Sequence, residues 1–178
     1  YLPLAYLVHL LGYRDNEWLK TTFLSVLLAR KHKDEACLYG ERFAADLSPH
    51  FRSAALDRVK YHREQGHYIV LATASPDLYV DAINSIVEFD EIVCTKIAWS
   101  VDGKFEGLAG GNCYGERKLQ RVQQLLARLG QANLRAVYSD HRSDSALLAA
   151  ADIAYLVNPD TRTERSVRIE GLQKLDWS

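Results

Sequence analysis

The chain has 178 residues, enough for one domain, or a domain with a small insertion, to bury a sizeable core. Hydrophobic residues make up 48% of it and charged residues 25%, as in an ordinary soluble globular protein. The formal net charge of −1 gives no overall attraction to nucleic acid or to an anionic membrane, so we expect neither partner.

The opening stretch YLPLAYLVHLLGY is apolar but shorter than the roughly 20 residues that a membrane-spanning helix needs. We therefore expect no transmembrane segment and interpret the stretch as an ordinary helix. It has no preceding basic region, so it does not have the pattern of a secretory signal. The three cysteines are widely spaced, lack metal-ligand spacing and favour a reducing compartment, so we expect small buried thiols and a cytoplasmic location.

The next part of the chain is helical in pattern. Residues 15–31 carry apolar side chains at helical spacing, namely Trp18, Leu19, Phe23, Val26 and Leu27. Residues 34–46 have weaker support, from Ala36, Leu38, Phe43 and Ala44. A further helix is expected within residues 47–66, where Ser48 can cap the N-terminus, Pro49 suits the first turn and Gly66 suits the C-terminal end.

After residue 66 the spacing of the apolar residues changes. Segments typical of strands then alternate with segments typical of helices. The expected elements in chain order are strand 67–72, helix 77–87, strand 91–95, a hairpin turning at Asp102 and Gly103, helix 116–129, strand 134–139, helix 144–151 and strand 153–157. Alternating strands and helices predict an α/β fold, with a Rossmann-like parallel sheet covered by helices on both faces.

Polar residues follow three of these strands. They are Thr73, Ala74 and Ser75 after the first, Asp140 and Asp144 after strand 134–139, and Asn158 and Asp160 after the last; Lys118 begins the helix before strand 134–139. Ligands of parallel sheets bind at the carboxyl ends of the strands, so these residues are candidates for a common site. The helix that begins after Ser75 and Pro76 also suits a phosphate at its N-terminus.

Each candidate also has a purely structural interpretation. The sequence TASPD is a good helix cap, and a lysine in a first turn is usually solvated. Asp140 and Asp144 could be a turn former and an N-cap, with His141 and Arg142 as exposed turn residues. The order of the candidates and their position at strand ends are what favour a function.

A hydroxyl, a lysine and two carboxylates form a coherent phosphoryl-transfer site. Carboxylate oxygens suit Mg²⁺, which takes one or two protein carboxylates and keeps several waters. The ion and the lysine would neutralise the phosphoryl oxygens, and the hydroxyl of Thr73 would donate a hydrogen bond to them.

These motifs resemble those of the haloacid dehalogenase-like (HAD) phosphohydrolases, in particular the phosphoserine-phosphatase-like branch with a helical cap. YIVLATASPD is similar to the second family motif, GGNCYGERKLQRV to the third and VYSDHRSDSALLAAAD to the fourth. The resemblance implies that Thr73 and Lys118 are catalytic and that Thr73, Ala74, Ser75 and Lys118 bind the substrate. It also implies that Asp140 ligates Mg²⁺ and that Asp144 binds the ion through water or braces the site.

Two differences from the family pattern stand out. Ser139 stands where the family usually has glycine, and His141, Arg142 and Ser143 are bulkier than usual. The first family motif, Asp-x-Asp-x-Thr, is not found in the 178 residues. Its first aspartate is the covalent nucleophile of the family, and the family order places it before the helical cap, so we expect it upstream of Tyr1.

The resemblance divides the chain into a helical cap segment, residues 1–47, and a HAD-like α/β core, residues 48–178. It implies hydrolysis of a small phosphorylated metabolite through an aspartyl-phosphate. Two alternatives stay open: a phosphatase of a phospholipid head group, and a phosphate-binding regulatory module without the nucleophile. A dinucleotide-binding fold is disfavoured, because no G-x-G-x-x-G follows a strand. The sequence does not indicate the oligomeric state.

Overall fold

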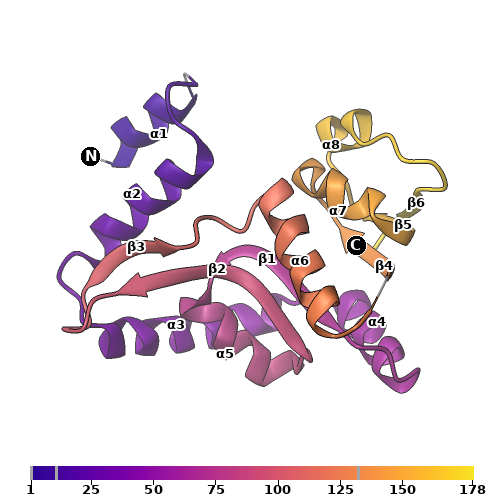
Figure 1. Ribbon diagram of the computed structural model, residues 1–178, viewed down its shortest axis with the longest axis horizontal. Helices are drawn as coiled ribbons and strands as arrows, with labels where there is room; N and C mark the ends of the chain where they lie inside the picture. Colours follow the sequence, from indigo (N-terminus) through magenta and orange to yellow (C-terminus); the bar gives the residue numbers. More distant parts are fainter. Residues whose placement is uncertain (1, 11, 132) are drawn as a thin grey trace. The chain divides into compact units, whose positions relative to one another are not determined.

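The computed structural model describes residues 2–10, 12–131 and 133–178 (Figure 1). Contacts between Cα atoms divide the chain into two compact units. Unit 1 comprises Tyr1–Pro49, Ala74–Glu88 and Cys94–Asn112, and unit 2 comprises His50–Thr73, Phe89–Val93 and Cys113–Ser178. Among the described residues, no helix combines the length and apolar character that a bilayer crossing requires.

Unit 1 contains most of the helical first part of the chain. Its helices are α1 (Leu2–Leu10), α2 (Asn16–Leu28), α3 (Lys33–Leu47) and α5 (Asp77–Val87). The carboxylate of Asp15 caps α2 by accepting a hydrogen bond of 2.7 Å from the backbone N–H of Trp18. Helix α3 packs along α5, α1 packs against α2, and α2 packs against strand β3 (Phe105–Ala109) (Figure 1).

The predicted hairpin is present. Strand β2 (Glu91–Trp99) pairs antiparallel with β3, with Lys96 opposite Ala109 and Trp99 opposite Phe105. The turn between them includes Gly103, which has φ +68°, a conformation that glycine adopts without strain. β2 runs four residues beyond the predicted 91–95 because its second half is the first arm of this hairpin.

The core of unit 1 lies between its helices and the hairpin. Leu24, Leu28, Ala36 and Ile97 are buried there, with Leu78, Trp99, Phe105 and Leu108 packed partly against them. Phe23, Val26 and Leu27, which have helical spacing in the sequence, are 39%, 48% and 63% exposed. Since α2 is apolar on more than one side, its spacing alone does not identify the side that is buried.

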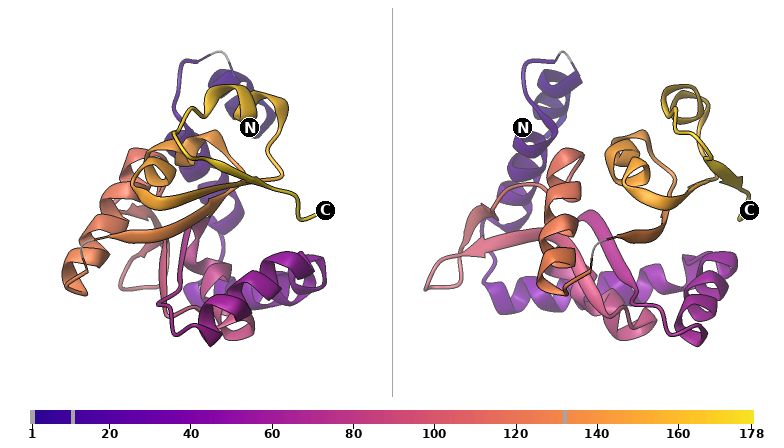
Figure 2. Two further views of the ribbon diagram at one scale, coloured as in Figure 1. Left: turned by 90° about the vertical axis from the view of Figure 1, so that its right-hand side faces the viewer. Right: turned by 45° about the vertical axis from the view of Figure 1, so that its right-hand side comes forward.

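Unit 2 contains most of the parallel sheet. Its elements include α4 (Ser53–Glu64), α6 (Glu116–Arg128), β4 (Leu134–Ser139), η2 (Arg142–Asp144), α7 (Ser145–Ala149), β5 (Ala151–Val157), α8 (Thr161–Ser166) and β6 (Gln173–Leu175). Strands β4, β5 and β6 are parallel neighbours in that order, and α7 contacts both β4 and β5 (Figure 2).

The core of unit 2 joins α6, α7 and the sheet. Val122 and Leu125 of α6, Leu148 of α7 and Leu156 of β5 are buried together in this core. Cys113 is also buried in it, while Cys94 is buried and Cys37 half-buried in unit 1, and none of the three forms a disulfide within the described residues.

Several predicted boundaries differ from the structure. The last helix before the sheet begins at Ser53 rather than at Ser48, because Ser48–His50 form a separate 3₁₀ turn. Strand β1 (Val70–Pro76) begins and ends later than the predicted 67–72, so Thr73, Ala74 and Ser75 lie within it. The predicted helix 144–151 is shorter, and α8 and β6 were not predicted from the sequence.

The strands form two three-stranded sheets, β1–β2–β3 and β4–β5–β6, within the described residues. Every residue of β1 is only half-buried, whereas a strand of the predicted sheet, with helices on both faces, would be buried. Among the described strands, β1 has a single neighbour, β2, which leaves it at a sheet edge. The predicted α/β fold with parallel strands and flanking helices is confirmed.

Candidate active site

The side chain of Lys118 is buried in unit 2. Helix α6 begins after Gly115, whose φ of +57° lets the chain turn into the helix, and Lys118 lies in its first turn. The residue exposes only 5% of its surface. Its Nζ atom lies 2.6 Å from Oδ1 of Asp144, so a buried ammonium and a nearly buried carboxylate form an ion pair. Lysine is rarely buried without such a partner.

Asp144 is held from a second side by Ser139. The hydroxyl of Ser139 at the end of β4 lies 2.9 Å from Oδ2 of Asp144 and donates a hydrogen bond to it. The same hydroxyl accepts a 3.2 Å hydrogen bond from the backbone N–H of His141. Nδ1 of His141 accepts from the backbone N–H of Ser143 at 3.1 Å, so the short turn is fixed by its own hydrogen bonds.

Asp140 lies in the same turn and is exposed. Within the described residues its carboxylate takes part in no hydrogen bond or ion pair, whereas both oxygens of Asp144 already accept from Lys118 and Ser139. The described residues contain no group of three or more His, Cys, Asp or Glu side chains that could enclose a metal. One available carboxylate fits Mg²⁺, which commonly binds through one or two carboxylates, waters and substrate oxygens.

Lys118 has further donors without an acceptor in the described part of the chain. A lysine ammonium carries three N–H groups, and Asp144 accepts one of them. Among the described residues, no second acceptor lies within hydrogen-bond distance of Nζ. A buried ammonium with unused donors is suited to bind the oxygens of an anion.

The predicted residues of β1 are divided between the two units. Thr73, which is half-buried, belongs to unit 2 together with Lys118, Asp140 and Asp144. Ala74 and Ser75 belong to unit 1. The structure therefore brings Lys118 and Asp144 into direct contact, with Asp140 in the same turn as Asp144, and it places Thr73 in the same unit.

The third predicted strand end has a structural role. Asp160 caps α8 by accepting a 2.6 Å hydrogen bond from the backbone N–H of Thr163, and this bond lowers the pKa of the Asp160 carboxyl. Oδ1 of Asn158 accepts a 2.6 Å hydrogen bond from the backbone N–H of Trp177. These contacts hold α8 and the C-terminal segment in place.

A second polar cluster, in unit 1, was not predicted from the sequence. Nζ of Lys20 in α2 donates to the carbonyl oxygen of Ala74 and, at 2.6 Å, to Oδ1 of Asn112. Thr95 and Asn112 are buried, with 0% and 3% exposure. Nδ2 of Asn112 is one of two buried side-chain polar atoms in the described chain without a hydrogen-bond partner. A single lysine on a helix gives no sequence signal for such a contact.

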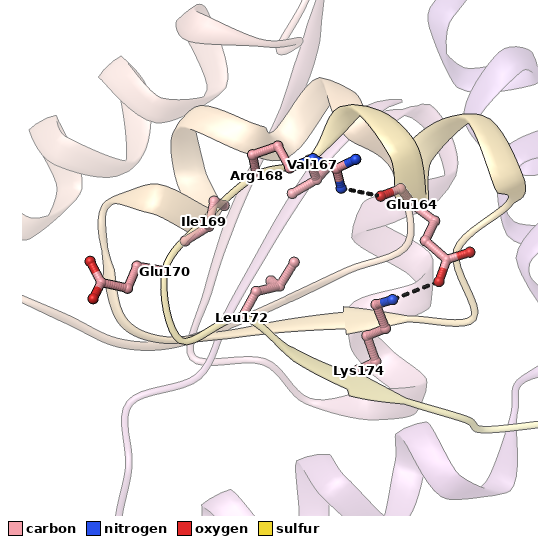
Figure 3. Close-up of a pocket in the computed structure, with 7 residues that line it drawn as sticks. All are labelled: Glu164, Val167, Arg168, Ile169, Glu170, Leu172 and Lys174. Atoms are coloured by element: carbon pink, nitrogen blue, oxygen red, sulfur yellow. Dashed lines mark hydrogen bonds and ion pairs between the residues drawn. The ribbon is translucent and has the colours of Figure 1, made fainter.

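A pocket of about 490 Å³ lies elsewhere in unit 2, between α8 and β6 (Figure 3). Lys174 and Glu164 on its wall form an ion pair of 2.6 Å with each other, and Arg168 donates to the carbonyl oxygen of Glu164 (Figure 3). None of the predicted site residues lines this pocket. Its charged groups are directed largely at one another, so we assign no chemistry to it.

Comparison with known proteins identifies the family of the chain. A sequence model of the haloacid dehalogenase-like hydrolase family matches residues 2–149. A probable phosphatase of Mycobacterium tuberculosis is 29% identical over 133 residues, which cover 74% of this chain and 46% of that protein. The chain spans about half the length of the curated relatives it matches.

Two solved structures share the fold. A protein of unknown function from Bordetella pertussis Tohama I superposes with a TM-score of 0.86 at 25% identity, over 98% of this chain and 80% of that chain. A probable phosphoserine phosphatase from Vibrio cholerae superposes with a TM-score of 0.74 at 12% identity, over 99% of this chain and 52% of that chain. The chain therefore belongs to the haloacid dehalogenase-like hydrolase family and has the fold of its phosphoserine-phosphatase-like branch.

Proposed function

We propose that this protein is a Mg²⁺-dependent phosphomonoester hydrolase that acts on a small phosphorylated metabolite. The observation that carries the proposal is the buried ammonium of Lys118, which Asp144 holds in place and which keeps donors for an anion. The exposed carboxylate of Asp140 in the neighbouring turn supports an ion site. The similarity to a probable phosphatase supports the same reaction class.

In this mechanism, Lys118 binds two phosphoryl oxygens and stabilises the charge that they carry in the transition state. The hydroxyl of Thr73 donates to a third oxygen and fixes the orientation of the group. Asp144 keeps the lysine in position, and Ser139 keeps Asp144 in position. Mg²⁺, held by Asp140, would neutralise charge on the transferring phosphoryl group.

The nucleophile of the proposed route is the first aspartate of the Asp-x-Asp-x-Thr motif. This motif is not among the 178 residues, and its presence in the full-length protein is part of the proposal. The aspartate attacks phosphorus, the P–O bond to the substrate breaks, and the leaving alcohol takes a proton from the second aspartate of the motif; water, deprotonated by that same residue, then hydrolyses the aspartyl-phosphate. We further propose that the helices of residues 1–47 select the substrate. A cytoplasmic location stays a prediction.

The test is Mg²⁺-dependent hydrolysis of p-nitrophenyl phosphate by the full-length protein. We expect Asp140→Asn to abolish the turnover and Lys118→Ala to lower it by roughly a hundredfold or more. Asp152→Asn and Lys104→Ala change exposed residues outside the site and serve as matched controls. Unchanged turnover in Asp140→Asn would rule out the ion site, and parental turnover in Lys118→Ala would rule out the lysine.

The two alternative functions predict different results. A regulatory module without the nucleophile would bind inorganic phosphate, measured by calorimetry, but would show no turnover. A phosphatase of phospholipid head groups would hydrolyse a phosphorylated lipid in mixed micelles much faster than soluble phosphomonoesters.

A further inference from the structure

The turn that follows strand β4 carries two side chains that the proposed mechanism does not use, those of His141 and Arg142. Both residues are half-buried, whereas the structural interpretation of the sequence had them exposed. Helix η2, which Arg142 begins, contacts both α6 and α8. The two residues belong to unit 2, as Lys118, Asp140 and Asp144 do.

The backbone of this turn is held by its own hydrogen bonds. The carbonyl oxygen of His141 accepts a 3.1 Å hydrogen bond from the backbone N–H of Asp144. The carbonyl oxygen of Arg142 accepts from the backbone N–H of Ser145 and, at 2.6 Å, from the Ser145 hydroxyl. Because both carbonyls are held, the side chains of His141 and Arg142 start from fixed points after the end of β4.

Both side chains have N–H groups without an acceptor in the described part of the chain. Nδ1 of His141 accepts from the backbone N–H of Ser143, so the proton of the neutral ring lies on Nε2, and among the described residues this Nε2–H meets no acceptor. The guanidinium of Arg142 has five N–H groups, and within the same residues it forms no hydrogen bond or ion pair. Such a planar fork of donors is suited to bind two oxygens of a carboxylate or phosphate.

Asp160 indicates where these donors lie. After the hydrogen bonds from Thr163, the nearby charges of Arg142 and His141 help to lower the pKa of the Asp160 carboxyl. Since both residues act on one carboxyl that follows β5, their side chains lie near the carboxyl ends of β4 and β5, which are parallel neighbours. Ligands of parallel sheets bind at this edge.

The charges at this edge leave Arg142 without a counter-charge in contact with it. Asp144 is paired with Lys118, and Asp140 holds Mg²⁺ in the proposed mechanism. Asp160 acts on Arg142 from a distance: its Oδ1 caps α8, and within the described chain the two side chains form no ion pair. Lys118 and the ion already neutralise the phosphoryl group, so the charge of Arg142 is left for another negative group of the substrate.

We propose that Arg142, together with the Nε2–H of His141, binds a second anionic group of the substrate, so that the enzyme prefers phosphomonoesters that also carry a carboxylate or a second phosphate. This inference rests on the proposed function and names the substrate class within it. Arg142 supplies the charge and two parallel donors, and His141 supplies a further donor. The preference requires residues of unit 2 only.

A purely structural role of Arg142 would give a different result. Its charge would then only support Asp160 at the start of α8, and a substitution would affect all phosphomonoesters alike. A substrate-binding Arg142 instead changes the ratio of kcat/KM between two substrates that differ only in the second anionic group.

The test measures this ratio in the full-length protein for pairs of substrates of equal length. 3-Phosphoglycerate is paired with glycerol 3-phosphate, and phosphoglycolate with 2-hydroxyethyl phosphate, so that each pair exchanges a carboxylate for an alcohol. Fructose 1,6-bisphosphate and fructose 6-phosphate test a second phosphate in the same way. We expect the anionic member of at least one pair to have a kcat/KM about tenfold higher, the effect of a charged hydrogen bond.

Arg142→Gln should lower this ratio about tenfold, mainly through the KM of the anionic member. Arg142→Lys retains the charge without the planar fork and should recover part of the ratio. His141→Asn keeps an acceptor for the N–H of Ser143 but has no donor in the place of Nε2, so its ratio should fall less than that of Arg142→Gln. The control Arg128→Gln removes an exposed arginine at the C-terminal end of α6 and should keep the parental ratio.

A parental protein that hydrolyses p-nitrophenyl phosphate but prefers the anionic member of no pair would overturn this inference and leave the proposed function intact. A preference that persists undiminished in a folded Arg142→Gln would do the same. Should Arg142→Gln fail to fold, parental ratios in both Arg142→Lys and His141→Asn would count against the role. A parental protein that hydrolyses no phosphomonoester would overturn the proposed function and the inference with it.

Discussion

At the scale of single residues, Lys118 and Asp144 form an ion pair in the interior of unit 2. Their side chains are 6% and 13% exposed and their charged atoms are 2.6 Å apart. Removing one partner from a buried ion pair leaves an uncompensated charge, which costs more than the pair contributes.

Asp144→Asn tests this pair with a substitution of nearly equal shape. We expect the free energy of unfolding to fall by about 3 kcal/mol, because the ammonium of Lys118 stays buried without a counter-charge. Urea unfolding measures the change. Asp152→Asn, on an exposed residue, should alter the unfolding free energy by less than about 0.5 kcal/mol. If the two variants had equal free energies of unfolding, the ammonium of Lys118 would have to contact solvent or another acceptor in Asp144→Asn.

His62 gives unit 2 a dependence on pH. Its Nε2 lies 2.9 Å from the hydroxyl of Tyr138 and its Nδ1 lies 2.8 Å from Nδ1 of His67. Burial, followed by the charges of His67, Arg58 and Arg135, lowers the pKa of His62 below its ordinary value of 6.5. The native state therefore favours the neutral ring.

As the pH falls through about 6.5, the unfolded chain takes up a proton at His62 that the native state resists. The free energy of unfolding should therefore decrease between about pH 7.5 and about pH 5.5. His62→Gln removes this titration and should make the decrease smaller, as urea unfolding at the two pH values would show. His50→Gln, on an exposed residue, should leave it unaltered. A decrease of the same size in His62→Gln would assign the pH dependence to other groups.

The residue scale also shows what the sequence can predict about the site. The motifs predicted Lys118, Asp140 and Asp144 as candidates, because strand ends and motif order are written in the sequence. They did not predict that Lys118 would be buried, since burial depends on contacts with distant residues. Lys20 and Asn112 come together over 92 positions of sequence, and no local pattern indicates such a contact.

At the scale of elements, the close packing of α3 on α5 depends on a glycine. A Cβ atom on Gly40 would lie 1.8 Å from the carbonyl oxygen of Leu78, far inside van der Waals contact. Alanine normally stabilises a helix interior relative to glycine by up to about 1 kcal/mol. Helix propensity alone predicts that alanine at position 40 would stabilise the protein, whereas this close contact predicts that it would destabilise it.

We expect Gly40→Ala to lower the free energy of unfolding by about 1–3 kcal/mol, because the two helices must move apart. Thermal or urea unfolding measures the change. Ala45→Gly, the reverse exchange at an exposed position of the same helix, should cost about 1 kcal/mol through propensity alone. A stabilised Gly40→Ala would show that α3 and α5 are not in close contact at this point.

Elements with a strong periodic pattern were predicted well. Helix 77–87 and strand 134–139 have the predicted bounds, and helix 116–129 differs by one residue at its end. The start of β1 was misplaced because His67, Tyr68 and Ile69 have strand-like character without taking part in the strand. The short elements α8 and β6 have few apolar residues, and their neighbours in space stabilise them.

At the scale of the whole molecule, neither unit is a continuous stretch of chain. Each consists of three segments, and β1 and β2 run from one unit into the other. The predicted division into a cap of residues 1–47 and a core of residues 48–178 stays a prediction. The order of helices and strands along the sequence suggests domains that are continuous in the chain. The contacts that define unit 1 instead join elements far apart in the sequence, α3 to α5 and α2 to β3.

This interleaving limits how the protein can be dissected. Leu24, Leu28 and Ala36 cover Ile97, and with it parts of Leu78, Trp99 and Phe105. In a polypeptide that starts at residue 48, those apolar side chains would be exposed to solvent, and exposed apolar surface promotes aggregation. A truncation to residues 48–178 would thus yield insoluble material for reasons unrelated to activity, and point substitutions are the informative route.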